Sequence, residues 1–354
     1  MIEFALRQWL LLASAAGLLL TSLYAGRVPA WSARELEVLF LLFALFVAVA
    51  GLRRSGLLDA LSRRLERGRG LAVRLVLATF FLSMLLTNDV VLVMLVPLTL
   101  AMDVGRKDVL VILEALAANA GSALTPFGNP QNLYIYWFYE VPAAQFMAAI
   151  APFTLAFLLL LVLAATLWAP VGDPRRRSPP QSVAAGAAGV HGGVLLVVLL
   201  AVLHLLPLWA VLPAVAFGVL VDRGALRVDY ALLASFLFFF GLSDNLRVLL
   251  AAQIDHAGHV FLFSALASQV IGNVPAALLF AEFTPHWDAL LWGVSAGGFG
   301  SLFGSLANLI AYRLYIEDRR TSGAGAFTLE FLFMGYVALF VAAGLYWYLH
   351  GGVA

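Results

Sequence analysis

The chain contains one unusual stretch twice, and each copy is rich in Gly, Asn and Ser although apolar runs flank it. Residues 119–136 read NAGSALTPFGNPQNLYIY, and residues 295–312 read SAGGFGSLFGSLANLIAY. Backbone at membrane depth departs from a helix only where protein or a water-filled cavity satisfies its N–H and C=O groups. Two interrupted segments at corresponding places in two halves of a chain are therefore the best sequence indication of a transporter's binding site.

Aligning the two copies places small and polar residues at matching positions. Glycines permit an unwound backbone and a close approach of other groups. The alternative, that the glycines only let helices pack closely in a membrane, stays open for each of them. The matched pairs are Ala120 and Ala296, Gly121 and Gly297, Thr125 and Ser301, Phe127 and Phe303, Gly128 and Gly304, Asn132 and Asn308, Leu133 and Leu309, and Tyr136 and Tyr312.

The composition assigns the chain to the lipid bilayer. With 63% hydrophobic and 12% charged residues and a mean hydropathy of +0.97, it has too little polar surface for a soluble domain of 354 residues. We predict a multi-pass protein of a bacterial-type inner (plasma) membrane. The net charge of +1 gives no reason to expect nucleic acid. The absence of cysteine, of an HExxH motif, of a Walker motif and of a serine elbow argues against an enzyme, a metal site and a cofactor.

The arginines predict the orientation. Residues 53–74 hold seven arginines against Asp59 and Glu66, which makes this loop cytoplasmic by the positive-inside rule. The N-terminus is then cytoplasmic too, with residues 8–24 as a retained first span; a cleaved signal peptide is the alternative. Leucines at helical spacing in residues 57–65 predict an amphipathic helix on the membrane surface.

Two long apolar segments are broken near their midpoints. A single span needs about 20 residues, whereas residues 71–102 are longer and are interrupted at Thr87, Asn88 and Asp89. We predict a re-entrant hairpin, with two full spans as the alternative. Residues 259–284 are interrupted in the same way around Asn273.

The predicted fold is an all-α polytopic membrane protein made of two inverted repeats, each with a re-entrant helical hairpin and a broken transmembrane helix. We expect about 9–11 spans plus the two hairpins. A span at residues 230–241 should lead into a polar external stretch at residues 243–259. The N-terminal repeat covers residues 1–169 (hairpin 71–102, broken helix 109–138), a cytoplasmic linker residues 170–187, a connecting span residues 188–206, and the C-terminal repeat residues 207–354 (hairpin 259–284, broken helix 287–315).

Four segments carry a resemblance to a known family: residues 87–97 (TNDVVLVMLVP), 121–133 (GSALTPFGNPQNL), 268–277 (SQVIGNVPAA) and 297–312. They resemble the signature stretches of the ion transporter superfamily, and most of all its arsenical-pump and citrate-transporter-like permeases. The resemblance implies a secondary transporter with inverted repeats and a midplane site, driven by sodium or protons. Members move solutes as different as citrate, dicarboxylates, arsenite, sulfate and sodium, so the substrate does not follow from the fold.

The substrate site is predicted where the hairpin tips meet the broken helices. Each half-helix N-terminus carries about half a positive charge, so an anion can be held there without a basic side chain. No Lys or Arg occurs in the four interruptions. Asn88 and Asn273, at equivalent hairpin positions, can donate to substrate oxygens or accept toward a coupling cation. The predicted substrate-binding residues are Thr87, Asn88, Thr125, Gly128, Asn129, Asn132, Asn273, Ser301, Gly304 and Asn308.

Two carboxylates at membrane depth are predicted to bind the coupling ion together with Asn88 and Asn273. An ionised Asp there costs about 2.5–3.5 kcal/mol, so it is a functional candidate by default. Asp89 corresponds to Val274 in the second half, and it would bind a proton or a cation unless the substrate itself is neutral or cationic. Capping of the half-helix is its alternative role. Glu114 is the second candidate proton site, with pairing to an arginine as its alternative.

The sequence predicts a secondary active transporter of a small inorganic or carboxylic anion, or of an oxyacid such as arsenite, coupled to H⁺ or Na⁺. A sodium/proton antiporter of the same fold is one alternative. An anion channel is an alternative from another class, because channels also use re-entrant hairpins, but the inverted duplication favours alternating access. The expected partners are the lipid bilayer, the transported solute and, in a possible homodimer, a second copy.

Overall fold

The computed structural model describes residues 8–65, 70–102, 105–168, 182–250, 256–321 and 323–351. Throughout these ranges the secondary structure is helical and contains no strand, which confirms the all-α class. Five helices are long and apolar enough to cross a membrane, as a multi-pass protein requires. These are α3 (Ala33–Arg54), α9 (Ala143–Trp168), α10 (Ala185–Val202), α12 (Tyr230–Leu250) and α17 (Ala324–His350).

The remaining helices are shorter. Those of the predicted hairpins, α5, α6, α13 and α14, fall below the length of about 20 residues that a full span needs. The short elements are α2 (Trp9–Ala25), α4 (Leu57–Arg64), α5 (Leu71–Leu82), α6 (Asn88–Ala101), α7 (Lys107–Ser122), α8 (Pro130–Phe138), η1 (Leu208–Ala210), α11 (Val211–Val221), η2 (Arg223–Leu226), α13 (Ala257–Ile271), α14 (Asn273–Ala281), α15 (Trp287–Gly297) and α16 (Leu306–Glu317).

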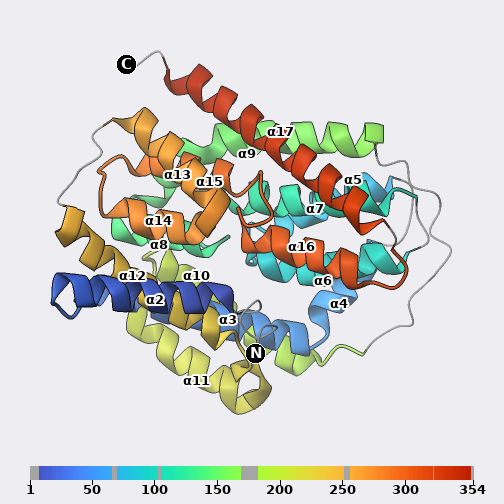
Figure 1. Ribbon diagram of the computed structural model, residues 1–354. Coiled ribbons are helices and arrows are strands. Elements are labelled where there is room, and N and C mark those ends of the chain that lie inside the picture. Colours follow the sequence, from blue (N-terminus) through green and yellow to red (C-terminus); the bar gives the residue numbers. More distant parts are fainter. Residues whose placement is uncertain are drawn as a thin grey trace.

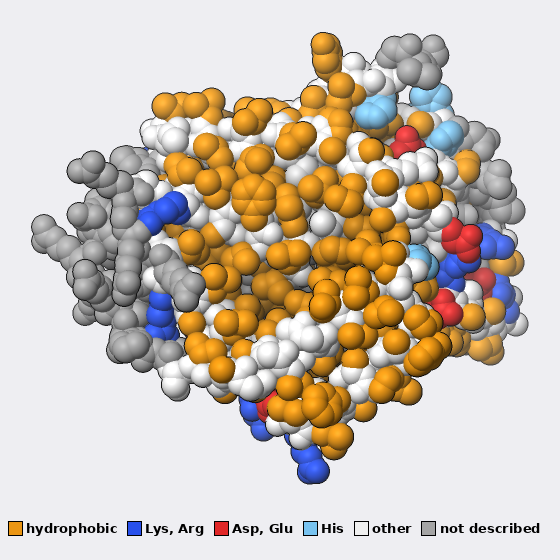
Figure 2. All heavy atoms as spheres, turned by 180° about the vertical axis from the view of Figure 1, so that it is seen from behind, with side chains coloured by type: hydrophobic (Ala, Val, Ile, Leu, Met, Phe, Trp, Pro, Cys, Tyr) orange, Lys and Arg blue, Asp and Glu red, His pale blue; other side chains and the backbone are white. Residues whose placement is uncertain are grey.

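The outer surface is apolar over a broad area. Figure 2 shows one face covered mainly by hydrophobic side chains, with charged side chains gathered at its margins. Leu159, Leu220 and Phe333 are among the large apolar residues that are exposed on the outer surface of the protein. Soluble monomers rarely expose contiguous apolar patches larger than a few hundred Å². The surface is therefore one that lipid covers.

Helix α7 lies at the centre of the protein (Figure 1) and is buried on every side from Val109 to Ser122. A helix that is apolar all round belongs in a core. It packs against α5, α6, α9, α16 and α17. Helix α15 is buried in the same way from Ala289 to Gly297. The first halves of both interrupted helices thus form the interior on which the remaining helices pack.

Each hairpin packs on the interrupted helix of its own half, α5 on α7 and α13 on α15. In the first hairpin the chain reverses over residues 83–87, and in the second it reverses at Gly272 alone. The φ angle of Gly272 is 89°, a conformation that side chains with a Cβ rarely adopt. A glycine is therefore required at this sharper tip.

Matching glycines bring the hairpins close to the interrupted helices. A Cβ on Gly121 would lie 2.1 Å from the carbonyl oxygen of Phe80. A Cβ on Gly297 would lie 2.9 Å from the carbonyl oxygen of Ala265 and 2.5 Å from Ser268 Cβ. These two glycines therefore serve close helix packing.

The expected polar external stretch at residues 243–259 is wrong over its first part, because α12 continues to Leu250. Asn245 points into the interface with α2, where its Nδ2 donates to Thr21 Oγ1 at 3.2 Å and to Ser22 Oγ at 2.9 Å. A side-chain amide group that the sequence suggested was solvated instead donates to a neighbouring helix. Most of the predicted linker, with Arg175–Arg177, lies outside the described residues, as do residues 66–69 of the basic loop.

We expect Gly121→Ala to destabilise the protein, because the new methyl group would meet a backbone carbonyl that cannot rotate away. Overpacking of this kind costs about 1–3 kcal/mol. Gly344→Ala is the matched control, since a Cβ on this α17 glycine meets no atom within 4 Å. Thermal unfolding of the purified variants in detergent measures the difference. Equal melting temperatures for both variants would contradict the packing role.

Candidate functional site

The tip of each hairpin is bonded to the unwound loop of the interrupted helix in its own half. The Asn88 N–H donates to the carbonyl oxygen of Gly128 at 3.2 Å, and the Asn273 N–H donates to that of Gly304 at 2.9 Å. The loops are residues 123–129, between α7 and α8, and residues 298–305, between α15 and α16. The two tips therefore meet corresponding points of the two interruptions.

The hydroxyl groups of Thr125 and Ser301, which correspond in the two copies, also bind the two hairpins. Thr125 Oγ1 donates to the carbonyl oxygen of Met84 at 2.7 Å, and Ser301 Oγ donates to that of Gln269 at 2.8 Å. Both hydroxyls were predicted to bind substrate. In this structure each one donates to a carbonyl group at or just after the last turn of the first hairpin helix, and its contact with substrate stays a prediction.

Asn132 and Asn308 hold the unwound loops together. Both side chains are buried, and each donates to carbonyl groups that lost their helical partners where the helix unwinds. This is a structural task that the two residues perform in the same way in both halves. Asn132 Nδ2 donates to the carbonyl oxygens of Ser122 (3.1 Å), Ala123 (2.9 Å) and Thr125 (3.0 Å), and Asn308 Nδ2 donates to those of Gly298 (2.9 Å) and Ser301 (3.0 Å).

The second half of each interrupted helix begins with a capped N-terminus. Asn129 Oδ1 accepts from the Asn132 N–H at 3.0 Å at the start of α8, and Ser305 Oγ accepts from the Ala307 N–H at 3.2 Å at the start of α16. Such caps satisfy N–H groups that a helix leaves free. Asn129, predicted to bind substrate, is thus used as a cap.

A chain of amides links the two halves. Asn88 Nδ2 donates to Asn119 Oδ1 at 3.2 Å, and Asn119 Nδ2 donates to Asn308 Oδ1 at 2.8 Å. Asn119 was missing from the predicted site. It opens the first copy of the duplicated stretch, but its counterpart is Ser295, so the symmetry of the polar residues did not single it out.

The two tips face one cavity of about 100 Å³, which we call the inner cavity. Of the predicted site residues, Asn88, Asn273 and Asp89 line it, and Thr87 lines the neighbouring cavity. The others lie in the unwound loops, in the first turns of α8 and α16 or, for Glu114, within α7. Residues that were not predicted also line the inner cavity. Among these are Gln131, Asp229, Ser305 and Arg313.

The neighbouring cavity, which we call the vestibule, is larger, at about 700 Å³. Arg53, Arg54 and Arg227 line it, and it shares Asp89, Asp229, Leu232 and Leu306 with the inner cavity. The hairpin tip with Asp89 is therefore next to a space that opens among the arginines of the basic loop.

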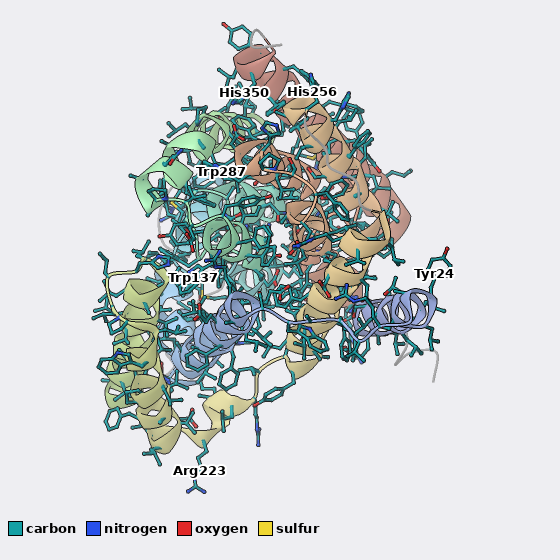
Figure 3. All side chains as sticks on the ribbon, turned by 90° about the vertical axis from the view of Figure 1, so that its left-hand side faces the viewer. Tyr24, Trp137, Arg223, His256, Trp287 and His350 are labelled. Atoms are coloured by element: carbon teal, nitrogen blue, oxygen red, sulfur yellow. The ribbon has the colours of Figure 1, made fainter. Side chains whose placement is uncertain are left out.

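An ion pair borders the vestibule. Arg54 Nε and Nη2 donate to the two carboxylate oxygens of Asp222 at 2.7 and 3.2 Å, which ties the end of α3 to η2. The hydrogen bond from Arg54 holds the pKa of Asp222 below its ordinary value. Arg223, the next residue, points away from the body of the protein (Figure 3). Arg54 is thus an arginine of the vestibule whose charge is paired, with Asp222.

The Asp89 carboxylate has no hydrogen-bonding or ion-pair partner among the described residues. Its Oδ1 is buried and accepts no hydrogen bond from any described residue, and no side chain caps the N-terminus of α6. The capping role is thus not what the structure shows. The Asp89 N–H itself donates to Asn88 Oδ1 at 3.0 Å. The carboxylate remains available to a ligand in the inner cavity.

Glu114 is fully buried between α6 and α7. Its Oε1 accepts from Thr99 Oγ1 at 2.6 Å, and its Oε2 lacks a partner within the described part of the chain. The alternative, a pairing with arginine, is wrong, because no described arginine forms an ion pair with it. Glu114 lines neither cavity and precedes Asn119 by about 7.5 Å along the helix axis.

Metal ligation is not apparent. Among the described residues no group of three or more His, Asp and Glu side chains is placed to hold a metal ion. The polar groups of the site are instead amides, hydroxyls and backbone groups, with Asp89, Asp229 and Arg313 as the charged side chains that line the inner cavity.

Fold and site together define a polytopic helical membrane protein with a polar cavity at two hairpin tips. The citrate transporter family model matches residues 1–297, and the chain belongs to this family. It is 37% identical over 309 residues to the inner membrane protein YbiR of Escherichia coli strain K12, covering 82% of each chain. It is 33% identical over 294 residues to the uncharacterized transporter MJ0456 of Methanocaldococcus jannaschii, covering 79% of this chain and 81% of that protein.

A plant protein matches a shorter part. The silicon efflux transporter LSI3 of Oryza sativa subsp. japonica is 34% identical over 167 residues, which are 44% of this chain and 34% of the plant protein. These findings confirm the resemblance to the citrate-transporter-like permeases. The protein is a multi-pass membrane transporter and not an enzyme.

We expect Thr125→Val to lower thermal stability without changing solute affinity, because the hydroxyl bonds a hairpin carbonyl. Losing one such hydrogen bond costs about 0.5–1.5 kcal/mol. Thr166→Val is the control, since this exposed hydroxyl bonds only Leu163 O in its own helix, at 2.7 Å. Thermal unfolding and KM for uptake are the measurements. A raised KM with unchanged stability would return Thr125 to the substrate site.

Proposed function

We propose that the protein is a secondary active transporter that moves a small anion or an uncharged oxyacid by alternating access, coupled to H⁺ or Na⁺. One observation supports this above the others. Asn88 and Asn273 come from different halves of the chain, line the same inner cavity, and are each attached by the same backbone bond to an interrupted helix.

The matched hydrogen bonds support two inverted repeats. Hairpin tip, loop hydroxyl and loop amide form corresponding bonds in both halves. Sites of this kind, at the junction of two repeats with broken helices, are exposed alternately to each side as one unit moves against the other. The positive-inside rule places the vestibule, with its arginines, on the cytoplasmic side, together with the N-terminus. The structure would then be open inward.

Size and electrostatics support a compact solute rich in oxygen. The N-termini of α6, α8, α14 and α16 lie around the interruptions, and each contributes about half a positive charge. The amides of Asn88 and Asn273 can donate to oxygen atoms. A citrate transporter family membership is consistent with a carboxylate, and the name of the silicon efflux transporter is consistent with an oxyacid.

Buried oxygen atoms without a hydrogen-bond partner support the proposal that transport is coupled to an ion. Asp89 Oδ1, Glu114 Oε2 and Asn132 Oδ1 are buried and accept no hydrogen bond within the described ranges. A carboxylate in such a place binds a proton or a cation more readily than it remains charged and alone. Asp89, at the cavity, is the coupling site that we propose, and Glu114 is a second proton site on α7.

A sodium/proton antiporter of the same fold is the second candidate. Two carboxylates, Asp89 and Asp229, line the inner cavity, an arrangement that suits a cation.

The test that separates these candidates is flux into proteoliposomes of a panel of oxyanions, dicarboxylates and arsenite, with imposed Na⁺ or H⁺ gradients. Saturable, gradient-driven solute uptake supports the transporter. Sodium flux without solute supports the antiporter, and flux far above turnover rates supports an anion channel.

We expect Asn88→Ala and Asn273→Ala each to reduce solute uptake by about tenfold or more, because each removes a hydrogen bond to the solute worth about 1.4 kcal/mol. Asn245→Ala, at the interface of α2 and α12, is the control with intact uptake. Uptake into proteoliposomes is measured after size-exclusion chromatography has verified folding. Normal uptake by both site variants would refute the assigned site.

We expect Asp89→Asn to change the pH or cation dependence of uptake, because the amide cannot bind a proton or hold a cation as a carboxylate does. The control is Asp59→Asn, which lies at the vestibule and not at the inner cavity. Initial rates are compared between pH 5 and 9, with and without Na⁺. A dependence identical to that of the wild type would make Asp89 a structural residue.

A further inference from the structure

Arg313 is a basic side chain at the inner cavity that the duplicated motif does not include. It belongs to α16, the second half of the second interrupted helix, and it lines the inner cavity with Asn88 and Asn273. Its side chain is exposed and forms no hydrogen bond or ion pair with any residue that the structure describes. No described acidic side chain therefore neutralises the charge of Arg313.

The geometry of α16 places Arg313 on the helix face that borders the inner cavity. The helix begins at Leu306 beside the interruption, and Arg313 follows about 10 Å further along the axis. Side chains on a helix lean toward its N-terminus, so the guanidinium group extends back over the turn that contains Leu309. Leu309 and Leu306 line the same cavity. Arg313 thus lines the inner cavity beside the turn that contains Leu309.

The other charges at the inner cavity are negative. Asp89 Oδ1 accepts no hydrogen bond from any described residue, and Asp229 uses Oδ1 to accept from the Leu232 N–H at 2.9 Å as the cap of α12. Without Arg313, these carboxylates would repel an anion. Farther out, at the vestibule, Arg54 is already paired with Asp222. The guanidinium group of Arg313 is the charge in the inner cavity that favours an anion, and its planar fork matches two oxygen atoms of a carboxylate or oxyanion.

We propose that Arg313 is a specificity-determining residue that binds the charged oxygens of the solute in the inner cavity. This proposal rests on the proposed function and narrows it: the solute carries a negative charge, as a carboxylate or an oxyanion does, and is not an uncharged oxyacid. The sequence had suggested that helix termini alone would hold an anion. In the structure, a side chain outside the motif supplies a full positive charge.

The natural chain has no cysteine, which permits a test that needs no knowledge of the solute. Leu309→Cys introduces a single thiol into the inner cavity, one helical turn from Arg313. The purified protein is labelled with an anionic reagent, sulfonatoethyl methanethiosulfonate, and with its cationic trimethylammonioethyl analogue. The ratio of the two rates measures how strongly the cavity favours an anion. The ratio is compared in four backgrounds: wild type, Arg313→Gln, Arg313→Lys and Arg319→Gln.

We expect Arg313→Gln to lower the ratio by about fivefold, since a unit charge about 8 Å away acts in opposite directions on the two reagents. Arg319→Gln removes the same charge from an exposed position six residues further along the chain, outside both cavities, and should leave the ratio unchanged. Arg313→Lys keeps the positive charge and should retain most of the preference for the anionic reagent. The effect of Arg313→Gln should shrink in 1 M salt, where screening extends over only about 3 Å.

Three results would overturn the proposal. The first is that the thiol introduced by Leu309→Cys reacts in no background, and the second is an unchanged ratio of labelling rates in Arg313→Gln. The third is an equal fall of this ratio in Arg319→Gln, which would identify Arg313 as one of several surface charges. Uptake adds a separate readout, in which Arg313→Gln raises KM for an oxyanion or dicarboxylate. If the labelling ratio falls as expected but no solute is transported, the proposed function fails and the anion site stands. If arsenite uptake proceeds with an unchanged KM in Arg313→Gln, the transporter stands and the anion site fails.

Discussion

Hydrogen bonding of unwound backbone in a place without bulk water is the constraint on which the structure depends. Each interrupted helix leaves carbonyl and N–H groups without helical partners, and lipid offers none. Asn132 and Asn308 donate to the freed carbonyls, and Asn129 and Ser305 accept from the freed N–H groups. The interruptions are stable because polar side chains of the same segments replace the missing helical bonds.

The same constraint positions the hairpins. Their tips have unpaired backbone groups too, and these bind the unwound loops through Asn88 and Asn273. Four half-helix N-termini are thereby brought near one cavity. The amide chain through Asn119 connects the two halves of the protein. A polar site deep in the protein follows from satisfying the backbone, and Asp89 and Arg313 then give the cavity its charged groups.

The sequence predicted those parts of the site that are repeated. The pairing of Asn132 with Asn308 and of Thr125 with Ser301 was visible because both copies kept the same chemistry. Their predicted role as solute ligands could not be decided in that way, since a buried hydroxyl serves equally well to bind a carbonyl, and Thr125 and Ser301 do so here. Asn119 was missed because its counterpart is Ser295, and Arg313 because it lies outside the duplicated stretch.

The sequence by itself determined that the chain is helical, spans a membrane several times and carries two polar interruptions, because hydropathy and the need to pair backbone groups in lipid leave few other solutions. Only the tertiary structure decided which polar side chains form hydrogen bonds within the protein and which remain unpaired at the cavity. That distinction depends on the partner at the end of each hydrogen bond. The Asn245 amide group donates to α2, whereas Asp89 Oδ1 and Arg313 have no hydrogen-bond partner among the described residues and line the same cavity.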